Sequence, residues 1–248
     1  TGTQKIEDEL SLLFPEARIL RMDADSTMGR FSHENKLREF ADGKYDILLG
    51  TQMVAKGLDF ENVTLVGVIN ADQQLNNDDF RSQERTFDLL TQVVGRAGRG
   101  KYEGTAVIQT CNPENDVIQI AARQDYEAFF NDELKTRKML IYPPYCDICL
   151  IGFVGENESK VRTASLKLTD WLKERFVGDY NDLKIIALGP MPARVSKISN
   201  KFRYRLILKC KNSKRFRALM DELLRFTGSD KAFNDVSVYI DINPENII

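Results

Sequence analysis

The chain has 248 residues, of which 42% are hydrophobic and 29% are charged. A domain commonly takes about 100–200 residues, so this length predicts two domains, and the composition excludes a disordered chain. No stretch approaches the roughly 18 consecutive apolar residues of a membrane span. Residues 1–5 contain neither an initiator methionine nor the apolar core of a signal peptide. We therefore expect a fragment of a larger protein, and four cysteines in a chain too large to need disulfide bonds indicate a reducing cytoplasm.

The net charge of −2 conceals an asymmetry between the two parts of the chain. Residues 1–140 carry 17 basic and 24 acidic side chains, whereas residues 141–248 carry 18 basic and 13 acidic ones. Such a difference is typical of parts that bind different partners.

The first part of the chain alternates between predicted strands and helices. We expect helices over 5–14, 32–42 and 81–94, and strands over 18–22, 46–50, 63–69 and 104–109. Ser32 is the expected N-cap of the second helix. The nearly continuous apolar run 63–69 is typical of a strand covered on both faces of a parallel sheet. This order predicts an α/β domain with a parallel sheet.

Residues 114–138 are predicted to form a helical connector that ends at the rigid 142–145 segment, Tyr-Pro-Pro-Tyr. Beyond it we expect strand 148–154, helix 158–176, strands 184–188 and 202–210, helix 213–226 and strand 236–242. This β-α-β-β-α-β order is a split βαβ, ferredoxin-like arrangement. The expected domains are therefore 1–113, a connector over 114–144, and a smaller α+β domain over 145–248.

The strongest chemical signal is the 92–100 segment, Gln-Val-Val-Gly-Arg-Ala-Gly-Arg-Gly. Arg96 and Arg99 are three residues apart at a helix end, where they share one face. Guanidinium groups grip phosphate oxygens and stabilise the charge of a transferring γ-phosphate. The alternative is an ordinary helix end, rich in cations and stopped by glycine.

A second signal, the 50–60 segment, directly follows a predicted strand. Open α/β sheets place ligands at the carboxyl ends of their strands. Thr51, Gln52 and Lys56 can reach backbone phosphates from there, and Asp59 can pair with an arginine or hold a nucleotide hydroxyl.

These two segments resemble motifs V and VI of superfamily 2 helicases, which lie in the second RecA-like lobe of such motors. The amino-acid sequence around them is similar to that of the PriA (primosomal protein N′) family of replication-restart DNA helicases. The residues that carry this likeness are 2–7, 20–23, 48–57, 84–87, 89–93, 142–144 and 188–190.

The resemblance implies an ATP-dependent 3′-to-5′ DNA helicase that acts at replication forks, with single-strand-binding protein and other primosome proteins as partners. Gln92, Arg96 and Arg99 match the ATP-sensing and arginine-finger positions. Gly57 and Asp59 match the motif that couples nucleotide to DNA, and Thr51 and Lys56 would face DNA.

Two departures limit what this chain can do. Leu58 stands where family members often carry histidine. The chain also contains no G-x-x-x-x-G-K-[ST] loop and no DExH-type magnesium motif. We therefore expect ATP and Mg²⁺ to be held mainly by a first lobe, and the family's zinc in a cysteine-rich segment upstream. The fragment should not hydrolyse ATP alone.

A basic stretch marks the second domain, because no Asp or Glu occurs between Leu183 and Met220. In strand 202–210, Phe202 and Tyr204 should face one way, and Arg203 and Arg205 the other. Cations and aromatic rings together favour contact with nucleic acid. We predict DNA contacts at Arg203, at Arg205, and at Arg194, Lys197 and Lys201 on a 190–201 loop. The alternative is a solvated cationic strand face.

Cys146 and Cys149 form a lone C-x-x-C in an apolar stretch, and we interpret them as strand cysteines rather than metal ligands. Two further functions stay open. The chain could be a partner-docking module that uses the apolar face of helix 158–176, formed by Val161, Leu166, Leu168 and Leu172. It could also be the second lobe of another superfamily 2 translocase or RNA helicase.

Overall fold

The computed structural model describes residues 2–22, 30–51, 60–95, 97 and 103–247, which fall into two compact units. The first unit comprises residues 1–76 and 82–130, and the second comprises residues 77–81 and 131–248. The division falls inside helix α6 (Tyr126–Leu140), before the 142–145 segment that we predict as the boundary. No helix in the described ranges is both long and apolar enough to cross a membrane.

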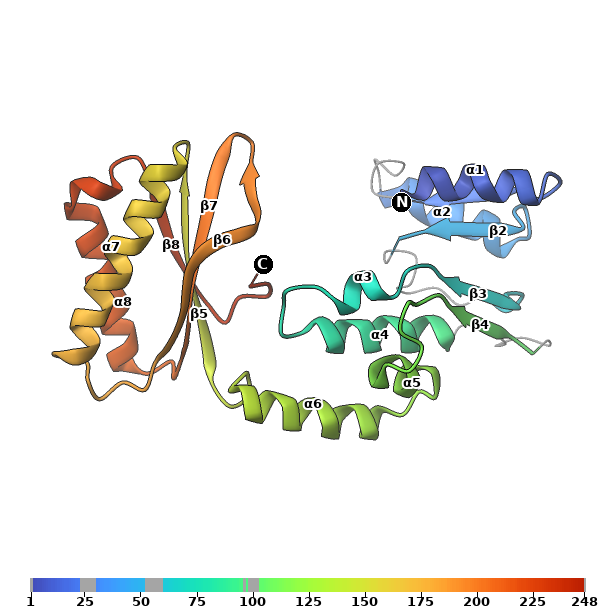
Figure 1. Ribbon diagram of the computed structural model, residues 1–248. Helices are drawn as coiled ribbons and strands as arrows, with labels where there is room; N and C mark the ends of the chain where they lie inside the picture. The colour runs from blue at the N-terminus through green and yellow to red at the C-terminus, as the bar shows by residue number, and fades with distance from the viewer. Residues whose placement is uncertain (1, 23–29, 52–59, 96, 98–102, 248) are drawn as a thin grey trace. The chain divides into compact units, whose positions relative to one another are not determined.

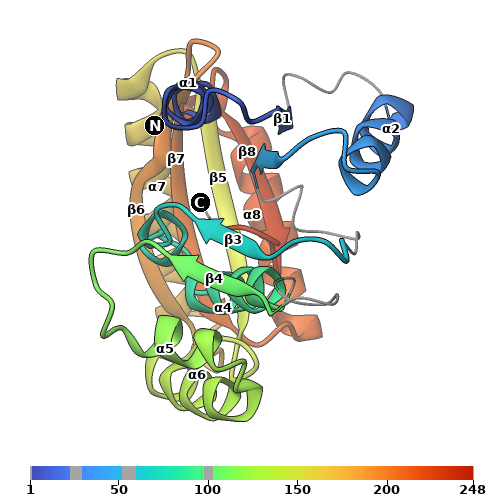
Figure 2. The same cartoon turned by 90° about the vertical axis from the view of Figure 1, so that its right-hand side faces the viewer.

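The first unit is α/β with parallel strands, as expected, but its described strands form two two-stranded sheets rather than one sheet. Its elements are α1 (Thr3–Leu13), β1 (Ile19–Met22), α2 (Arg30–Ala41), β2 (Ile47–Gly50), β3 (Leu65–Val68), α3 (Asp72–Leu75), α4 (Ser82–Val94), β4 (Thr105–Ile108) and α5 (Asp116–Ala122). β1 pairs with β2, and β3 pairs with β4 (Figure 2).

Two expectations for the first unit are wrong. Leu65 of β3 is 65% exposed, so the strand is not covered on both faces, and α2 begins at Arg30, which places Ser32 inside the helix.

The first unit has a small core around Leu20, Met22 and Leu37, and a larger one where α4 packs against α5. Phe87 and Leu90 of α4 are buried against Val117 and Ile118 of α5. The ring of Phe87 stacks on Phe129 with centroids 4.2 Å apart. The predicted connector is therefore two helices, α5 and α6, and the first of them belongs to this core.

The second unit confirms the predicted β-α-β-β-α-β order. It consists of β5 (Asp147–Gly155), α7 (Glu158–Val177), β6 (Ile186–Ile198), β7 (Lys201–Cys210), α8 (Lys214–Ser229), a 3₁₀ turn (Lys231–Phe233) and β8 (Ser237–Ile242). The antiparallel sheet has the order β6-β7-β5-β8, and α7 and α8 cover one of its faces (Figure 1). This is the ferredoxin-like arrangement.

The main core lies between this sheet and its two helices. The helices begin at side-chain caps, where Asn157 accepts from the Lys160 amide and Ser213 accepts from the Phe216 amide. Along the strands every second residue faces the helices, and the largest of them, such as Phe153, are fully buried. Val161, Leu168 and Leu172 of α7 are buried in the same core.

Three of the four residues proposed for partner docking are therefore core residues, which overturns that interpretation of α7. Only Leu166, 47% exposed, remains at the surface.

The opposite face of the sheet has a core of its own. Ile148 and Leu150 of β5 and Ile207 of β7 are buried there against Ile247 near the C-terminus, with Phe80 packed beside them. Phe80 belongs to the short segment 77–81, and its ring stacks on Tyr142 with centroids 4.9 Å apart. The second face of the sheet is thus covered over part of its area by residues far away in the sequence.

The cysteines yield a first testable consequence. Cys149 and Cys210 are buried, and burial raises the pKa of both thiols to about 12, whereas Cys111 is exposed. Since the thiolate is the nucleophile, we expect iodoacetamide at pH 8 to alkylate Cys111 in the native chain and to spare Cys149 and Cys210. Mass spectrometry of native and urea-unfolded samples measures this. Alkylation of Cys149 before unfolding would contradict the packing of β5.

Candidate functional site

Gln92, the first residue predicted to contact ATP, lies near the C-terminal end of helix α4. Thr86, Phe87 and Leu90 are buried, whereas Gln92, near the last turn, is exposed. The helix ends at Val94, and the Gly95 amide continues the pattern by donating to the Thr91 carbonyl at 3.0 Å. Because the inward face is held by α5 and Phe129, the position of this helix end is set by packing in the first unit.

The parallel strand pairs of the first unit present their carboxyl ends to loops. β2 ends at Gly50, and Thr51 beside it is exposed. At the ends of β3 and β4, the Asp72 carboxylate accepts hydrogen bonds from the Thr110 hydroxyl and the Cys111 amide, both at 2.8 Å. These bonds, that of the Cys111 amide foremost, lower the pKa of Asp72. Asp72 thus ties together the two loops that leave this pair of strands.

Most first-unit residues predicted to contact the nucleotide or DNA lie outside the described residues. Gln52, Lys56, Gly57 and Asp59 fall within 52–59, and Arg96 and Arg99 fall within the gaps after Gly95. Their roles stay predictions. In the described part of the chain, no group of three or more His, Cys, Asp or Glu side chains is placed to hold a metal ion.

The second candidate site is the β6–β7 hairpin of the second unit. The predicted 190–201 loop is wrong, because β6 continues to Ile198 and pairs with β7 up to Ile198↔Lys201. Ser199 and Asn200, with φ of 49° and 64°, form a two-residue turn of the kind that joins antiparallel strands. Arg194, Lys197 and Lys201 are all exposed on this hairpin, and Arg203 is half-buried.

The side-chain partners of the hairpin cations are neutral groups. No carboxylate in the described part of the chain forms an ion pair with Lys197, Lys201 or Arg203. Arg194 donates to the neutral amide oxygen of Asn77, and the ammonium of Lys197 lies 4.7 Å from the centroid of the Phe202 ring.

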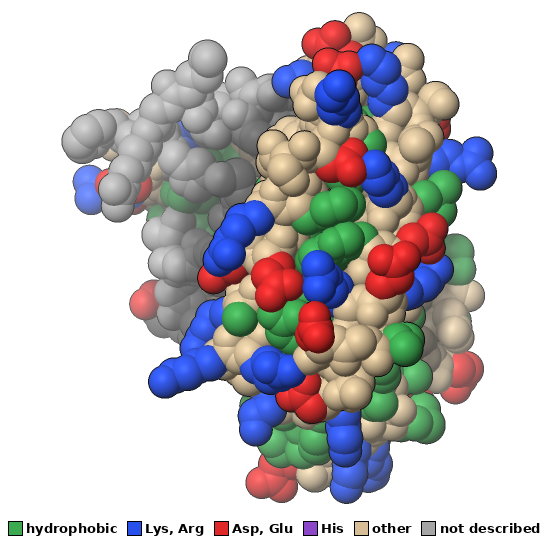
Figure 3. All heavy atoms as spheres, turned by 90° about the vertical axis from the view of Figure 1, so that its left-hand side faces the viewer, with side chains coloured by type: hydrophobic (Ala, Val, Ile, Leu, Met, Phe, Trp, Pro, Cys, Tyr) green, Lys and Arg blue, Asp and Glu red, His purple; other side chains and the backbone are tan. Residues whose placement is uncertain are grey.

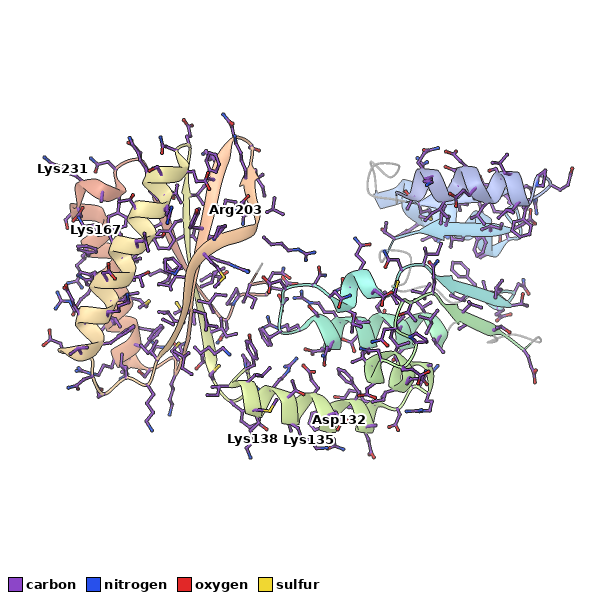
Figure 4. The ribbon with its side chains drawn as sticks, viewed as in Figure 1. Asp132, Lys135, Lys138, Lys167, Arg203 and Lys231 are labelled. Atoms are coloured by element: carbon purple, nitrogen blue, oxygen red, sulfur yellow. The ribbon has the colours of Figure 1, made fainter. Side chains whose placement is uncertain are left out.

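Five cations of the helical layer, by contrast, are paired with nearby acids: Lys160, Lys167, Lys173, Arg175 and Arg215. Lys160 lies 2.5 Å from Asp235, and Lys167 lies 2.6 Å from Asp230. Figure 3 shows basic and acidic side chains intermixed over this face. Figure 4 labels Lys167 and Lys231 on that layer and Arg203 on β7, across the sheet. Lys197, Lys201 and Arg203 thus lie close together on the β6–β7 hairpin without carboxylate partners, although some cations of the helical layer, such as Arg162 and Lys214, also form no ion pair in the described ranges.

Arg205 requires a correction to the predicted cationic strand face. Phe202 and Tyr204 do pack toward the helices as expected. Arg205, however, is only 6% exposed, because segment 77–81 and the C-terminal residues cover this part of the other face. Its guanidinium lies 2.5 Å from the Asp78 carboxylate and donates to the Ile247 carbonyl. Arg205 is a structural residue here, and its side chain is not free to reach a phosphate.

Lys209 on the same face is also buried. Its ammonium donates to the Leu140 carbonyl at 2.7 Å and lies 3.6 Å from the centroid of the Tyr142 ring. Desolvation lowers the pKa of this amine. The expected cationic face therefore persists only at the hairpin end of β7, at Lys201 and Arg203.

Sequence reasoning missed segment 77–81, which fixes this arrangement. Arg81 donates to the carbonyls of Pro244 and Glu245 at 3.1 and 3.2 Å, and the Asp79 carboxylate accepts from the Ile247 amide at 3.3 Å. The only local signal was a pair of acids followed by Phe and Arg, and nothing in it identifies partners more than 120 residues away.

Comparisons with known proteins match both units. Residues 2–101 match the family described as helicase conserved C-terminal domain, and residues 138–245 match the one described as primosomal protein N C-terminal domain.

Curated relatives carry the name replication restart protein PriA. The chain is 43% identical to that of Bacillus subtilis (strain 168) over 98% of its own length, and 41% identical to that of Synechocystis over 84%. It is 37% identical to the Borreliella burgdorferi protein over 98%. The chain spans only 30%, 24% and 35% of the lengths of these three relatives. With a helicase C-terminal domain followed by a primosomal protein N C-terminal domain, the chain belongs to the replication restart protein PriA family.

Proposed function

We propose that this chain is the second motor lobe and the DNA-contacting domain of an ATP-dependent 3′-to-5′ DNA helicase that restarts replication at forks in the cytoplasm. The observation that carries the DNA-binding part is the exposed, uncompensated cationic hairpin at Arg194, Lys197 and Lys201. Cations without carboxylate partners can exchange their counterions for DNA phosphates, and this exchange favours binding without sequence preference. Forked and single-stranded DNA, single-strand-binding protein and other primosome proteins are the proposed partners.

The proposed nucleotide role rests on the end of α4. Gln92 would contact ATP, and Arg96 and Arg99 would reach the γ-phosphate, where fixed guanidinium charge stabilises the transition state. The exposure of Gln92 and the packed inner face of α4 support this placement, since the helix end is both held and accessible. ATP and Mg²⁺ would be bound mainly by a first lobe.

The proposed coupling to DNA rests on the loop after β2. Gly57 and Asp59 would link the nucleotide state to DNA, and Thr51, Gln52 and Lys56 would contact its backbone. The exposure of Thr51 at the carboxyl end of a parallel strand supports this, because such ends are where α/β sheets bind ligands.

The chain by itself provides the test. We expect it to bind a labelled oligothymidine in fluorescence anisotropy, with affinity falling about 15- to 60-fold between 50 and 200 mM salt if three or four phosphates are contacted. We also expect phosphate release from ATP to stay at background, with or without DNA. Binding that is absent or independent of salt would contradict the DNA role. ATP turnover that co-purifies with the chain would contradict the division of the nucleotide site.

A further inference from the structure

The second face of the β6-β7-β5-β8 sheet is only partly covered. Segment 77–81, Tyr142 and Ile247 lie over Ile148, Leu150 and Ile207. The strand register places other residues on the same face, nearer the hairpin turn: Tyr239 opposite Gly152, Val154 opposite Arg203, and Lys201 opposite Ile198. Tyr239 is 40% exposed, Ile198 is 46% exposed, and Lys201 is exposed. Half of this face is therefore open to a ligand.

Tyr239 forms a flat, fixed surface in this open half. A Cβ placed on Gly152 would lie 2.1 Å from Cζ and 2.2 Å from Cε1 of Tyr239, so the ring rests directly on the glycine of the neighbouring strand. Only glycine leaves room for this contact. A ring supported in this way is already ordered, and a planar group can stack on its exposed surface at little further cost in side-chain entropy.

Arg205 lies in the same row of the sheet as Tyr239, across Gly152, but its charge is paired with Asp78, so the cations without carboxylate partners lie on the hairpin side of the ring. Arg203 is two strands away from Tyr239 and displaced from it by two residues along the strand direction. This corresponds to about 12 Å between backbones at ordinary sheet spacings. Lys201 is a further step along the same strand. Neither forms an ion pair in the described ranges. Asp241, exposed on the other side of Tyr239, disfavours phosphates there, so the charge gradient points toward Arg203.

We propose that the open half of this sheet face binds single-stranded DNA, with an unpaired base stacked on Tyr239 and the neighbouring phosphates on Arg203 and Lys201. The proposal rests on the proposed DNA-binding function and assigns that function a base-contacting residue. Every base has a π-face, so the site is tolerant of sequence, but it requires a base that is not paired in a duplex. Duplex DNA would use the cations without the ring.

The experiment uses the 248-residue chain and a short oligothymidine that carries one 2-aminopurine, whose fluorescence is quenched when it stacks. We expect quenching on binding by the wild type and by Tyr239→Phe, which keeps the ring. Tyr239→Ala should lose the quenching and bind the single strand about 5- to 150-fold more weakly, the effect of losing one base–aromatic stack. Tyr145→Ala is the matched control, because Tyr145 is 43% exposed in the same unit, and it should behave as the wild type.

The outcomes separate this proposal from the one on which it rests. Salt-dependent binding by the wild type, combined with equal quenching by Tyr239→Ala, would overturn the stacking site and leave the DNA-binding function intact. Absence of binding to any DNA would overturn both. Equal weakening for single strands and duplex would also overturn the stacking site, because a stacked base requires an unpaired strand. Circular dichroism and the Tyr239→Phe variant control for misfolding.

Discussion

Changing Arg194, Lys197 and Lys201 together to Glu should weaken binding of forked and single-stranded DNA at least about 100-fold at 100 mM salt. The affinity for a single strand depends on salt concentration with an exponent of about 2 when three phosphates are contacted. At 100 mM salt, tenfold below 1 M, these three contacts therefore contribute about two orders of magnitude in affinity. Charge reversal adds repulsion to that loss. Fluorescence anisotropy with a labelled fork measures the effect. All three side chains are exposed, so the fold should be unaffected.

The matched control reverses three lysines of the helical layer, Lys160, Lys167 and Lys173. Their side chains are 58%, 45% and 68% exposed, and each is paired with an aspartate. The net charge changes by the same amount as in the hairpin variant. Affinity close to that of the wild type is expected, because these cations are already compensated. Equal losses in the two variants would show that overall charge, rather than the hairpin, holds DNA.

Replacing Asp78 with Ala should lower the free energy of unfolding of the second unit by about 2–3 kcal/mol. The change removes the carboxylate partner of the buried Arg205, and a buried charge without a partner is strongly unfavourable. The effect stays below the range of about 3–5 kcal/mol for fully buried pairs because the Asp78 side chain is 69% exposed. Urea unfolding followed by circular dichroism provides the measurement.

A double variant separates the charge effect from simple loss of contacts. Asp78→Ala combined with Arg205→Met removes both charges and keeps an apolar chain at position 205, so it should recover most of the lost stability. Because Arg205 is structural, Arg205→Met should also keep near-wild-type affinity for DNA. A change below about 0.5 kcal/mol for Asp78→Ala, which is typical of an ordinary surface position, would show that the Asp78–Arg205 pair does not stabilise this unit.

The order of elements in the second unit could be predicted because its strands and helices have clear periods. β7 alternates, and α7 places Val161, Leu168 and Leu172 at helical spacing. The extension of β6 past residue 188 was missed because Pro190 and Pro192 interrupt the pattern. Proline is tolerated on an edge strand, and β6 is the edge of this sheet. That information exists only after the strand order is known.

The burial of Arg205 and Lys209 could not be predicted from their own strand. Alternation correctly separates them from the helix-facing residues, but it does not say whether the other face is covered. Here Asp78, Phe80 and Ile247 cover it, and they come from distant parts of the chain. The local periodicity of β7 therefore predicts which face of the sheet each side chain lies on. Contacts with residues distant in the sequence determine which cations on that face remain exposed.

In the first unit, the short helix α3 and the division of 114–138 into two helices were not predicted. The break falls near Gln124, which has a φ of 54°, a conformation that a non-glycine residue adopts rarely and that no turn motif in the sequence announces. Gln92 and Thr51 lie exposed at the ends of α4 and β2, and their roles in binding ATP and DNA also stay predictions. The remaining motif residues stay predictions.

The most direct measurement is the salt dependence of single-strand binding by the wild type and by the Arg194→Glu/Lys197→Glu/Lys201→Glu variant. If the hairpin cations contact phosphates, the plot of log affinity against log salt concentration should become shallower by about 2 in the variant, the value for three contacts. Parallel plots with the same slope would show that these side chains exchange no counterions with DNA, and would contradict the assignment of the hairpin as the DNA-binding surface.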